Sequence, residues 1–112
     1  MSFLPREQRQ TRRPDFKAIN RAALRVLPDL LARWVPEGKI HGREWTGRNP
    51  KRTDRNPGSF KVNLVTGRWA DFATGDKGGD PISLAAYLFG LSQAEAARRV
   101  SGRLGASRED GR

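Results

Sequence analysis

The chain has 112 residues, 36% of them hydrophobic, which predicts one small domain with a thin core. It has no cysteine and a single histidine, which excludes disulfides and thiolate metal sites and leaves His41 unable to build a zinc site alone. The formal net charge of +10 favours a polyanionic partner, because lysine and arginine neutralise phosphates and release their counterions.

Residues 1–14 are polar and basic and contain two prolines, so we expect a flexible arm. The arm carries four arginines, and two roles stay open for them, contact with phosphate or simple exposure to solvent: Arg6, Arg9, Arg12 and Arg13. The arm has no apolar segment of the kind found in secretory signals. No apolar run approaches the roughly 20 residues that a membrane span requires, so we expect a cytoplasmic protein with no membrane partner.

Two short helices are expected after the arm. Asp15 is a suitable N-cap for a helix that reaches about Val26, because apolar residues then recur every three to four positions. Pro28 suits the first turn of a second helix, with Leu27 extended before it and Pro36 near its end.

A small antiparallel sheet is expected next. Residues 39–47 are predicted as one strand, although Gly42 weakens this interpretation. Residues 48–59 contain Asn-Pro and Pro-Gly pairs and are predicted as a long basic loop. Apolar and polar residues alternate over 59–64, and a return strand over 68–72 completes a β-hairpin at 59–72.

The glycine-rich segment 73–79 joins this hairpin to a helix that begins at Asp80 and Pro81 and ends at Gly90. Its glycines resemble a phosphate-binding loop, but the spacing differs from that motif and the carboxylate of Asp76 would repel phosphate. We therefore interpret the segment as a strand-to-helix connection.

A last helix is predicted from a capping box formed by Ser92 and Glu95. It is expected to reach about Val100 and to present a narrow apolar face. Residues 101–112 are expected to form a disordered tail. The predicted organisation is thus an arm at 1–14, one domain at 15–100 and a tail at 101–112.

A basic surface is predicted between Arg43 and Arg68. This segment contains seven lysines and arginines and two carboxylates, so its net charge is +5. The candidates for phosphate contact are Arg43, Arg48, Lys51, Arg52, Arg55, Lys61, Arg68 and, further along the chain, Lys77. Trp45 and Trp69 lie on neighbouring predicted strands and are candidates for base stacking. Packing in the core is the alternative for both tryptophans, and the thin core favours it.

Three carboxylates lie close together in the sequence, on Asp71, Asp76 and Asp80. Oxygen ligands of this kind suit Mg²⁺, so an enzyme that uses them is one hypothesis. No pairing of a nucleophile with a base accompanies them, and we therefore expect a chain that is not an enzyme and has no cofactor or metal.

Several short motifs occur in an order that resembles the N-terminal zinc-ribbon module of DNA primases from bacteria, phages and plasmids. They are Asn49-Pro50, the PGSFKV stretch at 57–62, Asp71-Phe72, the GGD at 78–80, the ISL at 82–84 and the GLSQAEA at 90–96. The resemblance covers about residues 16–100. It implies an α+β fold: N-terminal helices, a small antiparallel sheet around the 59–72 hairpin, and C-terminal helices.

The chain departs from this family at its metal site. The positions that match the four metal ligands are approximately Asn49, Arg52, Asp71 and Thr74, which cannot form a thiolate–imidazole zinc site. We therefore expect a zinc-ribbon-like sheet without zinc. An aromatic cluster of Trp45, Phe60, Trp69 and Phe72 is expected to hold it together instead.

In primases this module contacts the single-stranded template, and the polymerase chemistry lies in a separate domain that we do not expect here. The resemblance implies a non-catalytic module that binds nucleic acid, with single-stranded DNA favoured, in the replication of a mobile element. A primase, a helicase or another replication protein is a further expected partner. The alternative is a protein-interaction or regulatory factor that docks on a replication or defence protein.

Overall fold

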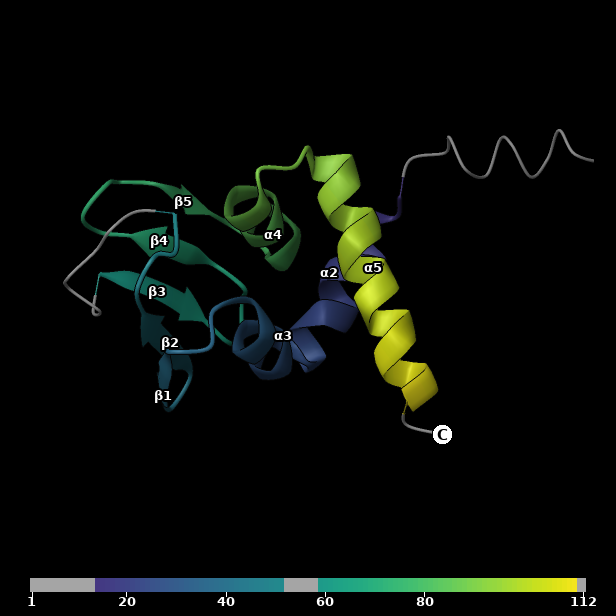
Figure 1. Cartoon of the computed structure of the whole chain (residues 1–112), viewed down its shortest axis with the longest axis horizontal. Coiled ribbons are helices and arrows are strands. Elements are labelled where there is room, and N and C mark those ends of the chain that lie inside the picture. Colours follow the sequence, from purple (N-terminus) through teal and green to yellow (C-terminus); the bar gives the residue numbers. More distant parts are fainter. Residues whose placement is uncertain (1–13, 52–58, 111–112) are drawn as a thin grey trace, which may run out of the picture.

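A sheet lies on one side of the molecule and helices on the other (Figure 1). The computed structural model describes residues 14–51 and 59–110, and within them four helices and a five-stranded antiparallel sheet. Two helices precede the sheet in the chain and two follow it, which confirms the predicted α+β class. Within these residues, no helix is both long enough and apolar enough to cross a membrane.

The first two helices are α2 (Phe16–Arg25) and α3 (Leu27–Trp34). Asp15 caps α2 as predicted, since its Oδ1 accepts a hydrogen bond from the Ala18 N–H over 3.1 Å. The prediction of an extended Leu27 is wrong, because Leu27 is the first residue of α3. A proline disfavours helical geometry in the residue before it, but the Leu27 side chain is fully buried, and this burial outweighs the local preference.

Five short strands follow, each antiparallel to the next: β1 (Lys39–His41), β2 (Glu44–Gly47), β3 (Phe60–Asn63), β4 (Trp69–Asp71) and β5 (Lys77–Gly78). The hairpin predicted at 59–72 is confirmed as β3 and β4. The single strand predicted over 39–47 is instead two strands, because Gly42 has a φ of +60° and the chain reverses there. The connection 73–79 is also more than a loop, since β5 lies within it and pairs with β4.

The last two helices are α4 (Pro81–Phe89) and α5 (Gln93–Asp110). Asp80 and Ser83 form a reciprocal capping box at the start of α4, and Gly90 ends it in the left-handed conformation. The α5 helix continues well past Val100, so residues 101–110 are helical where the sequence predicted an unstructured tail. Val100 is buried and Leu104 partly buried one turn later, which extends the packed face of the helix.

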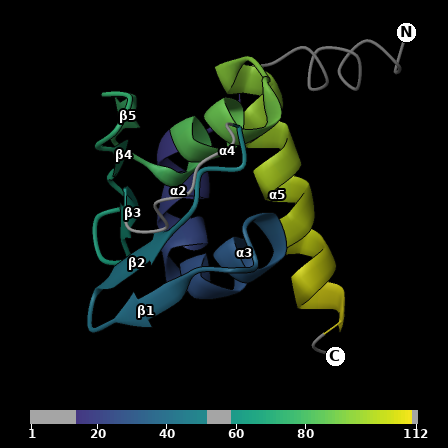
Figure 2. The same ribbon diagram turned by 60° about the vertical axis from the view of Figure 1, so that its left-hand side comes forward.

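The helices cover one face of the sheet, and no described element covers the other (Figure 2). Phe60 is fully buried at the centre of the covered face, and its ring meets Trp45 at 5.7 Å and Trp69 at 6.1 Å, edge to face in both cases. Phe72, which was expected in this cluster, is 71% exposed. Tyr87 of α4 takes that place instead, 4.6 Å from Trp69 and 6.4 Å from Phe60 between ring centroids.

Two adjacent glycines provide a test of this packing. A methyl group at Gly78 would overlap the Trp69 indole and lie 2.5 Å from Ser83 Oγ, whereas at Gly79 it would meet nothing within 4 Å. We expect Gly78→Ala to lower the free energy of unfolding by about 1–3 kcal/mol, as overpacking in a core does. Gly79→Ala should stay within about 0.5 kcal/mol of the parent protein. Urea denaturation followed by tryptophan fluorescence measures both, and equal losses would contradict this packing.

Candidate nucleic-acid interface

The uncovered face of the sheet, which we name the open face, carries a row of lysines across the strands. Strand pairing joins five residues into one row: Lys39, Thr46, Lys61, Ala70 and Lys77. Paired residues on neighbouring strands point to the same side of a sheet. The three lysines therefore stand on β1, β3 and β5, and since strands lie about 4.8 Å apart, they repeat about every 10 Å.

A shallow hollow on this face is lined by Lys61, Arg68, Lys77 and Phe72. The Phe72 ring projects into solvent, and Lys61 Nζ lies 5.9 Å from its centroid. The carboxylate of Glu44 lies 3.8 Å from Lys61 Nζ, but both side chains are well exposed, so this ion pair contributes little. The hollow thus combines three cations with an aromatic ring whose surface is accessible.

The structure brings together three of the predicted phosphate-binding residues, Lys61, Arg68 and Lys77, in this hollow. Two others lie at the ends of β2: Arg43 is exposed in the turn before it, and Arg48 is exposed just after it. They extend the positive charge beyond the hollow without lining it.

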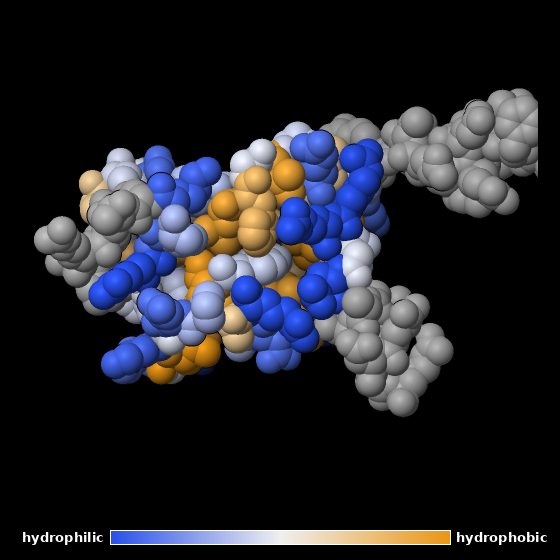
Figure 3. Space-filling model, in the orientation of Figure 1, coloured by the Kyte–Doolittle hydropathy of each residue, from blue (hydrophilic) through white to orange (hydrophobic). Residues whose placement is uncertain are grey.

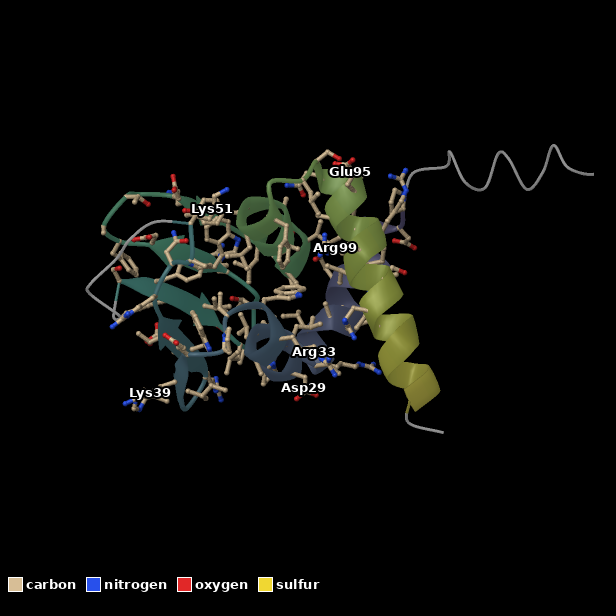
Figure 4. The ribbon with its side chains drawn as sticks, viewed as in Figure 1. Asp29, Arg33, Lys39, Lys51, Glu95 and Arg99 are labelled. Atoms are coloured by element: carbon tan, nitrogen blue, oxygen red, sulfur yellow. The ribbon has the colours of Figure 1, made fainter. Side chains whose placement is uncertain are left out.

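Lys51 is not part of the open face. Its Nζ lies 5.1 Å from the centroid of the Tyr87 ring on the α4 side of the sheet, and Figure 4 shows it at the opposite end of the sheet from Lys39. Arg52 and Arg55 lie outside the described residues. Lys39 was missed by sequence reasoning, because only the pairing of β1 with β2 places it in the row.

The two tryptophans that were candidates for base stacking are buried, with 4% of Trp45 and 5% of Trp69 exposed. Trp45 packs so closely on Gly38 that no side chain fits there, and the Trp69 indole N–H donates to Ser83 Oγ over 3.0 Å. Both rings are core residues, which confirms the alternative that the thin core favoured and rules out these two rings for base stacking. The exposed ring is Phe72, and strand alternation from Trp69 was the sequence signal that could have identified it.

A buried polar network lies on the covered side of the sheet, where the chain leaves β2. The Asn49 side-chain amide donates to Asp71 Oδ2 over 2.8 Å and to the Tyr87 hydroxyl over 2.7 Å. Only 1% of Asn49 and none of Asp71 is exposed. The Tyr87 hydroxyl in turn donates to Asp76 Oδ2 over 2.7 Å. Burial raises the pKa of Tyr87, and the hydrogen bond to Asp76 raises it further, so the hydroxyl keeps its proton.

This network occupies positions that the primase resemblance matched with metal ligands. Asn49 and Asp71 meet in it, and the Thr74 N–H donates to the Asp71 carbonyl over 3.2 Å, while Arg52 lies outside the described residues. The arrangement does not fit zinc, because Asn49 directs an N–H donor at the carboxylate and the chain has no thiolate.

The three carboxylates considered for Mg²⁺ serve different purposes in the structure. Asp71 accepts from Asn49, Asp76 accepts from Tyr87, and Asp80 caps α4. In the part of the chain that the structure describes, no three histidine, aspartate or glutamate side chains could together hold a metal ion.

The sequence was compared with models of known protein families and with curated proteins, and neither comparison gives a match. The primase resemblance therefore remains a prediction from the order of motifs. The chemistry of the open face and of the buried network is the basis for assigning a function.

Removal of the Asn49 amide tests the importance of the network. We expect Asn49→Ala to lower the free energy of unfolding by about 1.5–3 kcal/mol, because a buried carboxylate loses a hydrogen-bond donor. Asn63→Ala is the matched control, since the exposed Asn63 accepts from Val65 and Thr66 N–H groups in a turn and should cost about 1 kcal/mol. If the two variants unfold at the same urea concentration, the network does not hold the sheet together.

Proposed function

We propose that this protein binds single-stranded nucleic acid on the open face of its sheet, with DNA favoured, and that it does so without catalysis. The observation that carries the proposal is the exposed Phe72 ring in a hollow shared with Lys61, Arg68 and Lys77. Proteins that bind single strands combine cations that follow the phosphates with rings on which bases stack.

The geometry of the open face favours a single strand over a duplex. In a duplex the bases already stack on each other, so an exposed ring on a flat sheet would find no free base and Phe72 would add nothing. A single strand can place its phosphates along the lysine row and turn a base onto Phe72. The net charge of +10 adds an attraction that does not depend on sequence.

The order of motifs supports a more specific version of this proposal, a template-binding module of the primase type in the replication of a mobile element. In this version the bond between Asn49 and Asp71 takes over the task of the metal, which is to tie two loops of the ribbon together. A primase or helicase would supply the catalytic activity in trans.

Fluorescence anisotropy with a labelled single-stranded DNA of about 20 nucleotides tests the proposal, with duplex DNA and RNA as competitors across a salt series. We expect Phe72→Ala to weaken binding by about 5- to 150-fold, the equivalent of about 1–3 kcal/mol for one stacked base. Lys61→Glu and Arg68→Glu should each weaken binding and lower the slope of log affinity against log salt by about one.

Lys17→Glu is the charge-matched control, because Lys17 is exposed on α2, and the helices lie on the covered side of the sheet, opposite the open face. An equal loss in this variant would mean that the overall charge, not the open face, gives the affinity. Unchanged affinity in Lys61→Glu and Arg68→Glu would rule out this surface, and tighter binding of duplex DNA would rule out the single-strand preference.

A further inference from the structure

A second hollow, on the helical side of the molecule, combines arginines with aromatic rings. It is lined by Arg33 and Trp34 from α3, Phe89 from α4, and Arg99 and Arg103 from α5, and we name it the arginine hollow. Figure 3 shows hydrophobic residues gathered on this side over α4 and beside it, next to hydrophilic residues on α3 and α5. Figure 4 shows Arg33 and Arg99 on this same side, although they come from different helices.

The floor of the arginine hollow is apolar and fixed by packing. The Trp34 and Phe89 rings meet at right angles with centroids 5.8 Å apart, and both are partly buried against the core. The Arg99 guanidinium lies 4.6 Å from the Phe89 centroid, which holds that cation over the ring. Gly102 also lines the hollow and has open space beside it, so the α5 wall leaves room for a ligand.

The rim of the arginine hollow is positive. Arg33, Arg99 and Arg103 are exposed, and none of the described residues that line the hollow carries a carboxylate. Asp29 and Glu95 lie one turn before Arg33 and Arg99 on the same helices, but between described residues neither carboxylate forms an ion pair with an arginine of the hollow. The hollow therefore presents three guanidinium groups around an apolar floor, and arginine binds carboxylates with two parallel hydrogen bonds.

We propose that the arginine hollow docks an acidic peptide segment of a partner protein. Carboxylates of the segment pair with the three arginines, and an apolar side chain between them covers Trp34 and Phe89. Arginine and aromatic residues in a partly enclosed site are the types that carry most of the binding energy at protein interfaces. This site is separate from the open face, so the protein can hold a single strand on its sheet and an acidic protein on its helices.

Two other occupants fit the arginine hollow less well. A nucleic acid would need an open ring face for its bases, but Arg99 covers Phe89 and Trp34 packs against that ring at right angles. The chain's own residues 1–13 carry four arginines and one glutamate, so their charge has the same sign as the rim.

Binding of a labelled peptide to the full chain tests the proposal. The probe is a peptide of about twelve residues in which Asp and Glu alternate with Leu and Phe, and a second peptide has Lys at every acidic position. We expect the acidic peptide to bind at physiological salt and the lysine peptide not to bind. The double variant Arg33→Glu with Arg99→Glu should lower the affinity for the acidic peptide at least tenfold, because both contacts become repulsive.

Lys17→Glu with Arg21→Glu is the charge-matched control, since both side chains are exposed on α2 outside the arginine hollow. It should keep the affinity for the acidic peptide within about threefold. An equal loss in the two double variants, or no binding of the acidic peptide to the parent protein, would overturn the proposal. Circular dichroism confirms that each variant is folded.

The same variants separate this proposal from the one for the open face. The Arg33→Glu and Arg99→Glu variant should keep its affinity for single-stranded DNA. If that affinity falls as far as it does in Lys61→Glu, the arginine hollow belongs to a nucleic-acid surface and the docking proposal is wrong. If the acidic peptide binds and the DNA does not, the proposal for the open face fails and the docking proposal stands.

Discussion

The hydrogen bond from the Asn49 amide to the buried carboxylate of Asp71 connects two strands that are not neighbours, since Asn49 follows β2 and Asp71 ends β4. A fully buried carboxylate is costly unless donors surround it, and here Asn49 and the Ala73 N–H supply them. The same amide donates to Tyr87, which lies against Trp69 in the core. One side-chain amide thus connects the end of the sheet with α4 and with the aromatic packing between them.

The face that each residue of β4 presents follows from this arrangement. With Trp69 and Asp71 held inside, alternation turns Ala70 and Phe72 outward, beside Lys61 on the neighbouring strand. Because the helices cover only the opposite face, these residues stay accessible. The side chains that line the open face are therefore determined by which residues of β4 are buried in the core.

The protein has two basic hollows, and their rings distinguish them. On the open face Phe72 is 71% exposed and can accept a base. In the arginine hollow Trp34 and Phe89 pack against each other and the core, so they offer an apolar floor but no free ring face. Similar charge with different ring exposure is the reason that we propose a nucleic acid for one hollow and an acidic peptide for the other. Neither proposal depends on a bound metal, because hydrogen bonds and aromatic packing hold the sheet together.

The sequence by itself determined the parts of this fold that depend on contacts within a few residues. The caps at Asp15, Asp80 and Ser92 and the 59–72 hairpin form where the sequence predicts them, because the groups that bond lie within four residues of each other or flank one tight turn. Tertiary structure decided the rest. Strand register places lysines from β1, β3 and β5 in one row. Packing between the sheet and α4 puts Tyr87 against Trp69 and leaves Phe72 exposed. Alternation along β4 could have indicated that Phe72 points away from Trp69, but which residues of other elements it meets depends on burial and register, which join residues far apart in the chain.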